Sequence, residues 1–436
     1  MSASPSSQPR KFWGIQLSGS VLPSNLIGFY GACYAGILLA TFMPQMQPYL
    51  LSEFLHIPES EQGVVSGNIA FWGEIAIIIA AGFWGTMSDK IGRRHVMAVS
   101  FVIMAVGVAC FPFAKSYPQL ILFRIIFGIG IAAFSCMTIT ILADYVQDRS
   151  RGKATGLLGL ANGFGAMTTV FLILRLPSIL QAQGKDPHTA GIITYFIIAG
   201  ISLIFAAWMW ISLKKHDPAT QAVSNESFLE ITKKGLHAAK DHGVALAYAA
   251  AFVSRGNLAI VGTFFTLWLA NYGTSELGLS RADALARGGM IVGIAQGVTL
   301  IGAPIFGILS DKLARVDALI ISLLVSFVGY GGTFFIDDPF STKMIICAVF
   351  IGLGEVGVII TSAVLIAQQT PKDIRGAVIG FFNLSGAVGI LVAAKLGGYL
   401  FDHWRESGPF ILFGVLALMV TIWAILVRKK VVAVSN

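Results

Sequence analysis

Hydrophobic residues make up 56% of the 436-residue chain, about 244 residues, whereas charged residues make up only 12%. This charged share is about half that of a typical soluble domain, which argues against a soluble globular protein and excludes disordered, collagen-like and disulfide-scaffold chains. A transmembrane helix needs about 20 mostly apolar residues, so twelve such helices would use about 240. The net charge of +8 accompanies no basic cluster interleaved with aromatic residues, so nucleic acid is not an expected partner.

Long apolar runs recur from one end of the chain to the other, and continuous runs predict membrane-spanning helices instead of a β-barrel. The N-terminus has no compact apolar stretch of the signal-peptide type, so the first span is expected to act as an uncleaved insertion signal. The expected spans are 26–50, 62–87, 95–114, 119–143, 153–177, 190–213, 244–271, 285–309, 317–336, 342–366, 376–401 and 409–427.

Most lysines and arginines fall in alternate connections between these spans, which predicts that those connections and both termini are cytoplasmic. One long polar connection, 214–243, divides the chain near its midpoint. We therefore expect a cytoplasmic tail, a six-helix bundle, a cytoplasmic linker, a second six-helix bundle and a second tail, at residues 1–25, 26–213, 214–243, 244–427 and 428–436.

The two halves repeat each other. Residues 85–94 (GTMSDKIGRR) follow the second span and residues 307–315 (GILSDKLAR) follow the eighth, at an offset of 222. Residues 151–156 (RGKATG) open the fifth span and 375–380 (RGAVIG) open the eleventh, at an offset of 224. Two unrelated matches at nearly one offset indicate a duplicated six-span unit, which is the architecture of many secondary transporters.

The run at 85–94 resembles the signature loop of the major facilitator superfamily, with its weaker copy at 307–315, and Arg124-x-x-x-Gly128-x-Gly130 resembles that superfamily's span-four motif. The resemblance covers essentially the whole chain. It implies an all-α membrane protein with 12 transmembrane helices in two pseudo-symmetric six-helix bundles. It also implies a transporter that works by alternating access, is not an enzyme and needs no cofactor or metal.

In similar transporters the signature loops form a cytoplasmic gate, in which a carboxylate at a helix end accepts hydrogen bonds from the exposed N–H groups of a facing helix. The resemblance implies that Asp89 faces the start of the eleventh span and Asp311 the start of the fifth. Arg93 and Arg94 are expected to pair with Asp144 or Asp148. The alternative is that the cations only enforce topology. The predicted gate residues are Gly85, Asp89, Arg93, Arg94, Asp144, Asp148, Asp311 and Arg315.

Ionisable side chains inside the spans are candidates for function, because a charge at mid-bilayer costs at least about 2.5–3.5 kcal/mol. Glu74, Arg255 and Glu355 fall near the middle of their spans, and Arg124 lies nearer one end. The repeat does not duplicate Arg124 or Glu355, which favours substrate or proton binding over scaffold contacts. The alternative is a pair of structural ion pairs, Glu74 with Arg124 and Arg255 with Glu355.

Polar neighbours extend this candidate site. Asn257 lies beside Arg255, and Tyr30 and Tyr34 share one face of the first span. In similar transporters spans one, four, seven and ten line the cavity, so the tyrosines are expected either to contact substrate or to pack against neighbouring helices.

No nucleotide-binding motif is present, so uphill transport would draw on an ion gradient. Glu355 or Glu74 is expected to carry a proton, because burial disfavours an ionised carboxylate. Arginine binds carboxylate or phosphate through two parallel hydrogen bonds, so we expect proton-coupled symport of a small organic anion by a monomer in a bacterial inner membrane. The alternative is proton-coupled export of lipophilic compounds, drugs or lipids. A polytopic enzyme or a non-transporting receptor is more remote, since the histidines are scattered without metal-ligand spacing.

Overall fold

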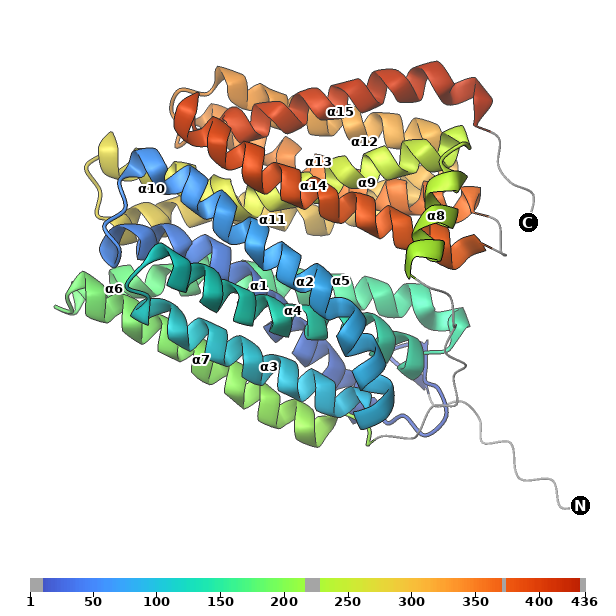
Figure 1. Ribbon diagram of the computed structural model, residues 1–436, viewed down its shortest axis with the longest axis horizontal. Helices are drawn as coiled ribbons and strands as arrows, with labels where there is room; N and C mark the ends of the chain where they lie inside the picture. Colours follow the sequence, from blue (N-terminus) through green and yellow to red (C-terminus); the bar gives the residue numbers. More distant parts are fainter. Residues whose placement is uncertain (1–10, 216–227, 371–373, 432–436) are drawn as a thin grey trace, which may run out of the picture.

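The computed structural model describes residues 11–215, 228–370 and 374–431, and it is built almost entirely of long helices (Figure 1). Within these residues, 12 helical spans are long and apolar enough to cross a membrane. They are α1 (Pro23–Glu53), α2 (Gln62–Ile91), α3 (Arg93–Cys110), α4 (Tyr117–Tyr145), α5 (Arg151–Phe171) with α6 (Leu176–Ala182), α7 (Pro187–Ser212), α9 (His242–Ile260) with α10 (Thr266–Ser275), α11 (Arg281–Lys312), α12 (Arg315–Gly332), α13 (Thr342–Gln369), α14 (Arg375–His403) and α15 (Gly408–Val427).

Every predicted span is therefore present, and most of the helices extend several residues beyond the predicted limits. The reason is that helical backbone hydrogen bonds continue into polar residues at the membrane surface, whereas an apolar run marks only the part inside the hydrocarbon. The segment between α9 and α10 is a π-helical turn, Val261–Phe265.

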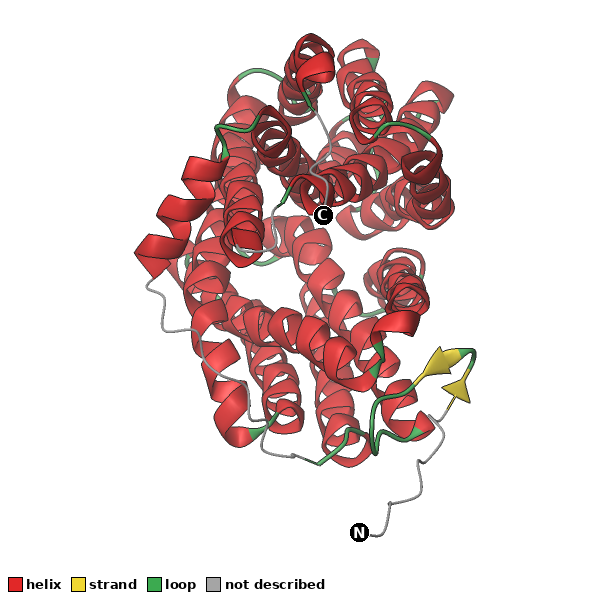
Figure 2. Cartoon of the chain, turned by 90° about the vertical axis from the view of Figure 1, so that its right-hand side faces the viewer, coloured by secondary structure: helices red, strands yellow, loops and turns green. Residues whose placement is uncertain are grey.

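The helices form two six-helix bundles, α1–α7 (the first half) and α9–α15 (the second half). Both ends of the described chain lie at one end of the bundles, which we call the termini end (Figure 1). The other end, which carries the turns from α1 to α2 and from α14 to α15, is called the opposite end. Figure 2 looks along the helices from the termini end.

The halves meet where α2 packs on α14 and α5 packs on α11. Glycines allow the backbones of α2 and α14 to touch near the opposite end. A methyl group on Gly67 would collide with the carbonyl oxygen of Ala394, and one on Gly398 would lie 2.6 Å from the carbonyl oxygen of Gly63. The interface is therefore closely packed on this side of the membrane.

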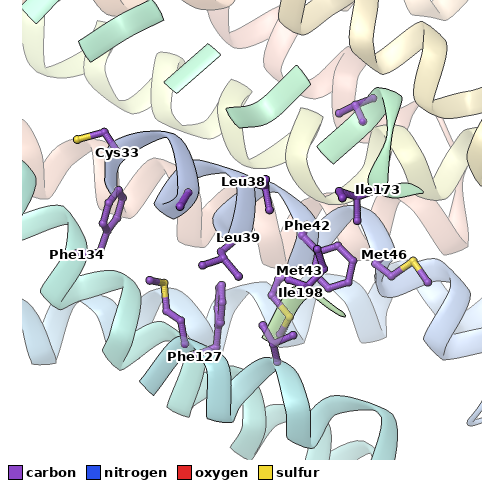
Figure 3. Close-up of a cluster of buried hydrophobic side chains, with 14 of the residues drawn as sticks. Cys33, Leu38, Leu39, Phe42, Met43, Met46, Phe127, Phe134, Ile173 and Ile198 are labelled. Carbon is purple, nitrogen blue, oxygen red and sulfur yellow. The ribbon is translucent and has the colours of Figure 1, made fainter. Parts of the chain in front are cut away.

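The core of the first half gathers around α1. Side chains of α1 such as Leu39 and Phe42 lie in one buried cluster with Phe127 of α4 and Ile198 of α7 (Figure 3). All four are at most 1% exposed. Because α1 is covered by protein over most of its length, its sequence is apolar on all sides.

Two further elements lie at the termini end. A short antiparallel hairpin, β1 (Lys11–Phe12) and β2 (Ile15–Gln16), lies within the segment predicted as a tail (Figure 2). It is fixed by hydrogen bonds from the Gln16 N–H to Ser150 Oγ and from the Ser18 N–H to the Tyr145 carbonyl. The helix α8 (Phe228–Ala238) lies in the predicted linker and packs on α14.

Candidate functional site

Arg124 and Glu74 come together inside the first half. Arg124 on α4 lies against the backbone of α2 at Gly73, where an added Cβ would be 2.7 Å from the arginine Nε. Its guanidinium lies 5.5 Å from the centre of the Phe127 ring, and its Nε is buried without a hydrogen-bond partner. Glu74 follows Gly73 on α2 and interacts electrostatically with Arg124. The sequence thus places a small residue where the arginine needs room.

Arg255 approaches the same acid from the second half. It lies on α9 against Gly386 of α14, where an added Cβ would be 2.6 Å from the arginine Cγ. Glu74 interacts electrostatically with Arg255 as well as with Arg124. Two arginines from different halves therefore interact electrostatically with one carboxylate, although within the described residues neither forms an ion pair with it.

The alternative pairing of Arg255 with Glu355 is wrong. Within the described residues no ion pair joins them, and Glu355 on α13 is 5% exposed in the interior of the second half. It interacts electrostatically with Tyr330 of α12. Arg255 and Glu355 lie on helices of the same bundle but interact with different neighbours, Glu74 and Tyr330. The positions of residues along their spans do not reveal this difference.

Buried polar side chains lie on α9 and α12, the helices that pack on the Glu355 helix α13. Asn257 on α9 is fully buried and donates a 2.9 Å hydrogen bond to Ser326 Oγ, so it does not face the interface beside Arg255. Both Asn257 Oδ1 and the Tyr330 hydroxyl are buried without a hydrogen-bond partner. The unused Tyr330 hydroxyl thus lies near a buried carboxyl group, and the unused Asn257 oxygen lies on another helix of the same bundle.

The two predicted tyrosines join α1 to α5. The Tyr30 hydroxyl donates to the Ala154 carbonyl at 3.0 Å, and the Tyr34 hydroxyl donates to Thr168 Oγ1 at 3.0 Å. Tyr30 is 7% exposed. In this conformation both hydroxyls bind to α5, as expected if the two tyrosines pack against neighbouring helices instead of contacting substrate.

The first signature loop is held together within its own half. Arg93 pairs with Asp89 and, at 3.1 Å, with Asp144, as expected for that pair. Arg94 instead lies over the Trp210 ring, 5.4 Å from its centre. The side chain of Asp148 lies outside the described residues.

Gly92 ends α2 with a φ of 94°, a left-handed conformation that favours glycine and gives the tight turn into α3. Gly85, the first residue of the loop motif, lies close to α4. A Cβ added to Gly85 would be 3.9 Å from Cys136 Sγ, which is an ordinary van der Waals contact.

The second signature loop is also held together within its own half. The expected contacts of Asp89 and Asp311 with helix starts of the other half are not formed within the described residues. Asp311 lies 3.7 Å from Arg315 and its side chain is 83% exposed. Within the described residues, neither Asp311 nor Asp89 contacts the facing helix starts of the other half. Added methyl groups on Gly159 and Gly307 would meet open space.

The opposite end carries contacts that the sequence did not single out. Arg281 at the start of α11 is 5% exposed and donates to Glu59 of the first half at 3.1 Å. Glu59 Oε1 also accepts from Thr274 at 2.6 Å. Ser178 of α6 donates to Asp283 of α11 at 2.5 Å.

A carboxylate cap completes this closure. Asp402 at the end of α14 accepts hydrogen bonds from the N–H groups of Gly63 and Val64, at 2.8 and 2.7 Å, where α2 begins. Deeper in the same interface, Lys395 donates to Asn68 of α2. A cap across the interface of two bundles is the arrangement predicted for Asp89, and the structure shows it at the other end of the molecule.

The model of the Major Facilitator Superfamily matches residues 28–342 and, in a second alignment, 289–435. The chain belongs to the Major Facilitator Superfamily. The second alignment overlaps the first and falls on the second half of the chain, in line with the internal repeat.

Relatives and solved structures agree with this assignment. The magnetosome protein MamH of Paramagnetospirillum magneticum is 24% identical over 90% of both chains. The multi-drug resistance efflux pump PmrA of Streptococcus pneumoniae is 25% identical over 81% of this chain and 86% of its own, and the sialic acid transporter NanX of Escherichia coli is 24% identical over 80% and 82%. The crystal structure of the nucleoside transporter NupG superposes with a TM-score of 0.73 at 13% identity, covering 94% of this chain and 100% of NupG. This member of the superfamily is thus an integral, multi-pass membrane protein of a transporter family.

Proposed function

We propose that the chain is a proton-coupled symporter of a small organic anion that works by alternating access. One feature carries the proposal: Arg124 and Arg255, from different halves, both interact electrostatically with one acid, Glu74. Two cations against one anion leave one positive charge to be matched by a ligand. A carboxylate held by both halves would favour the conformation in which they close around it.

The relatives support the ligand class and also supply the competing candidate. NanX is named for a sialic acid, which is an organic acid. PmrA is named as an efflux pump, which supports the second candidate, proton-coupled export of lipophilic compounds. The paired arginines favour the anion.

Glu355 is the proposed proton carrier. When ionised it would need a donor, and the Tyr330 hydroxyl, which interacts electrostatically with it and is buried without a hydrogen-bond partner, offers one. This hydroxyl is not engaged by another side chain, so the buried carboxyl could change its protonation state without breaking a contact that holds the bundle.

We further propose that the termini end, which is rich in basic residues, faces the cytoplasm, and that the protein acts as a monomer in a bacterial inner membrane. The structure then corresponds to an inward-facing state, closed on the outside. In the outward-facing state the exposed Asp89 and Asp311 would be free to cap the starts of α14 and α5.

The test is a thermal-stabilisation screen of the purified protein with organic anions, cations and neutral lipophilic compounds. A ligand at 100 times its Kd stabilises by about 2.7 kcal/mol, which gives a clear rise in melting temperature. We expect anions to stabilise the wild type, Arg255→Ala to lose that response, and Arg287→Ala, which removes an exposed arginine, to keep it. Stabilisation by cations or neutral lipophilic compounds alone would contradict the proposal and favour the exporter.

A further inference from the structure

The carboxyl group of Glu406 lies at the opposite end, where two other carboxylates and a buried cation interact with it. Glu59 belongs to the first half, whereas Asp402 and Glu406 belong to the second, and Glu406 interacts electrostatically with each of the other two. The cation is Arg281, which donates to Asn271 Oδ1 at 2.8 Å and to Glu59 at 3.1 Å. Its Nε is buried without a hydrogen-bond partner.

Two of the carboxylates are committed to contacts between the halves. Both oxygens of Asp402 accept N–H groups at the start of α2, from Gly63 and Val64. Glu59 accepts from the guanidinium of Arg281. Because these donors need an acceptor, both groups serve as carboxylates in the closed interface.

Glu406 differs from these two. It lies in the turn between α14 and α15 and hydrogen-bonds Asn271 of its own half. Since Asn271 Oδ1 is occupied by Arg281, the amide N–H of Asn271 is the group that faces Glu406. An ionised Glu406 would therefore add a negative charge beside Glu59 and Asp402, while the single cation is already engaged.

We propose that Glu406 is a proton-binding site whose protonation stabilises the closed opposite end of the transporter. Burial, the largest cause, raises the pKa of Glu406 from its ordinary value of 4.5 to about 7, and the negative charges of Glu59 and Asp402 add to the rise. The hydrogen bond from Asn271 and the charge of Arg281 oppose it.

The sign of the pH dependence follows from these two values. When the halves separate at this end, Glu406 returns to solvent and to a pKa near 4.3. The closed state then binds more protons than the open state between about pH 4.5 and 7. Closure is fully favoured below this window and weakens as the pH rises through 7, by on the order of a hundredfold, since each unit of pKa is tenfold in the equilibrium.

Other titratable groups surround this site and must be separated from Glu406. His403 and Glu61 interact with Asp402, and Glu53 interacts with Arg281. His403 is a neighbour whose contribution must be tested separately, and its exposed ring stacks on Tyr399. We expect His403→Gln to leave the transition in place.

The test measures the width of the opposite end without any substrate. Spin labels are placed at the exposed positions Lys185 and Lys343, one in each half, after the native cysteines are replaced, and distances are recorded from pH 5 to 8.5. The wild type should move from short to long distances as the pH rises. Glu406→Gln and Glu406→Ser should stay short throughout, so a folding defect in one variant would not decide the result. Glu276→Gln, which neutralises an exposed acid at the same end, should behave as the wild type.

Three results would overturn the proposal: a wild type whose distances do not depend on pH, Glu406 variants that keep the wild-type transition, or a transition abolished by His403→Gln. The inference rests on the proposed function only in that the halves separate at this end. A failure of the anion screen would leave the distance measurement intact, so the two can fail separately.

Discussion

The guanidinium of Arg281 lies 3.1 Å from the carboxylate of Glu59, and this ion pair connects the two halves of the chain. Neither residue belongs to a recognised motif. Together with the cap that Asp402 forms on α2, the pair accounts for closure at the opposite end while the signature loops at the termini end make contacts only within their own halves.

Removal of this cation should open the end that the structure shows closed. Arg281→Ala removes the charged hydrogen bonds to Glu59 and Asn271, and such bonds contribute about 1.5–3 kcal/mol each at most. We expect the closed population to fall at least tenfold in spin-label distance measurements at pH 5. Arg287→Ala, on the exposed face of the same helix, should leave the distances unchanged. A closed population equal to that of the wild type would show that packing of α2 on α14 closes this end unaided.

The fold was predictable from the sequence and this ion pair was not. Long apolar runs report the spans directly, and the repeat at 85–94 and 307–315 reports the two bundles. Arg281, in contrast, sits at the start of a helix near a span boundary, where a charge normally serves solubility or topology. Its partner is 222 positions away, and only the packing of two bundles brings them together. Lysines and arginines are scarce on this side of the membrane, and this scarcity was the one feature of the sequence that could have drawn attention to Arg281.

Asp89 should matter for the state that the structure does not show. Its side chain is 46% exposed here and pairs with Arg93, and exposed pairs contribute only about 0–1 kcal/mol. If Asp89 caps α14 in the alternative state, Asp89→Asn should weaken that state by about 1 kcal/mol, or roughly fivefold in population. The measurement is the fraction of long distances at the opposite end at pH 8.5, which should fall. Asp317→Asn, at the same end but paired with Arg428 within the second half, is the matched control. Equal effects of the two variants would contradict a gating role for Asp89.

Gly73 should be required for the position of Arg124. In Gly73→Ala the new methyl group would lie 2.7 Å from Arg124 Nε and 3.0 Å from its Cγ, so the arginine must move. Overpacking of this kind costs about 1–3 kcal/mol, and the displaced guanidinium should weaken anion stabilisation in the thermal screen. Gly82→Ala on the same helix meets open space and should be neutral or slightly stabilising, because alanine favours helix over glycine. An unchanged anion response in Gly73→Ala would remove Arg124 from the site.

The sequence predicts which ionisable residues belong to the candidate site, but it does not predict how they pair. Charges inside apolar spans identify Glu74, Arg124, Arg255 and Glu355 because the bilayer makes each of them costly. Which acid faces which arginine depends on the rotation of each helix about its axis, and that rotation is set by contacts such as Gly386 against Arg255. Sequence spacing therefore proposed the members of the candidate site, which remain a prediction, but it could not choose the partner of Arg255, since no ion pair with Glu355 is formed.

Glu355 should carry the coupling proton, and its neutral isostere tests this. Glu355→Gln keeps the volume of a side chain that is 5% exposed, so the bundle should remain folded. It cannot gain or lose a proton, so uptake of a stabilising anion into liposomes should no longer respond to an imposed pH gradient, while exchange of labelled for unlabelled anion continues. Tyr330→Phe removes the hydroxyl beside the carboxylate and should shift the pH dependence of uptake without abolishing it. If Glu355→Gln retains uptake driven by the pH gradient, the proton must be carried elsewhere, and Glu74, which faces both arginines, becomes the next group to test.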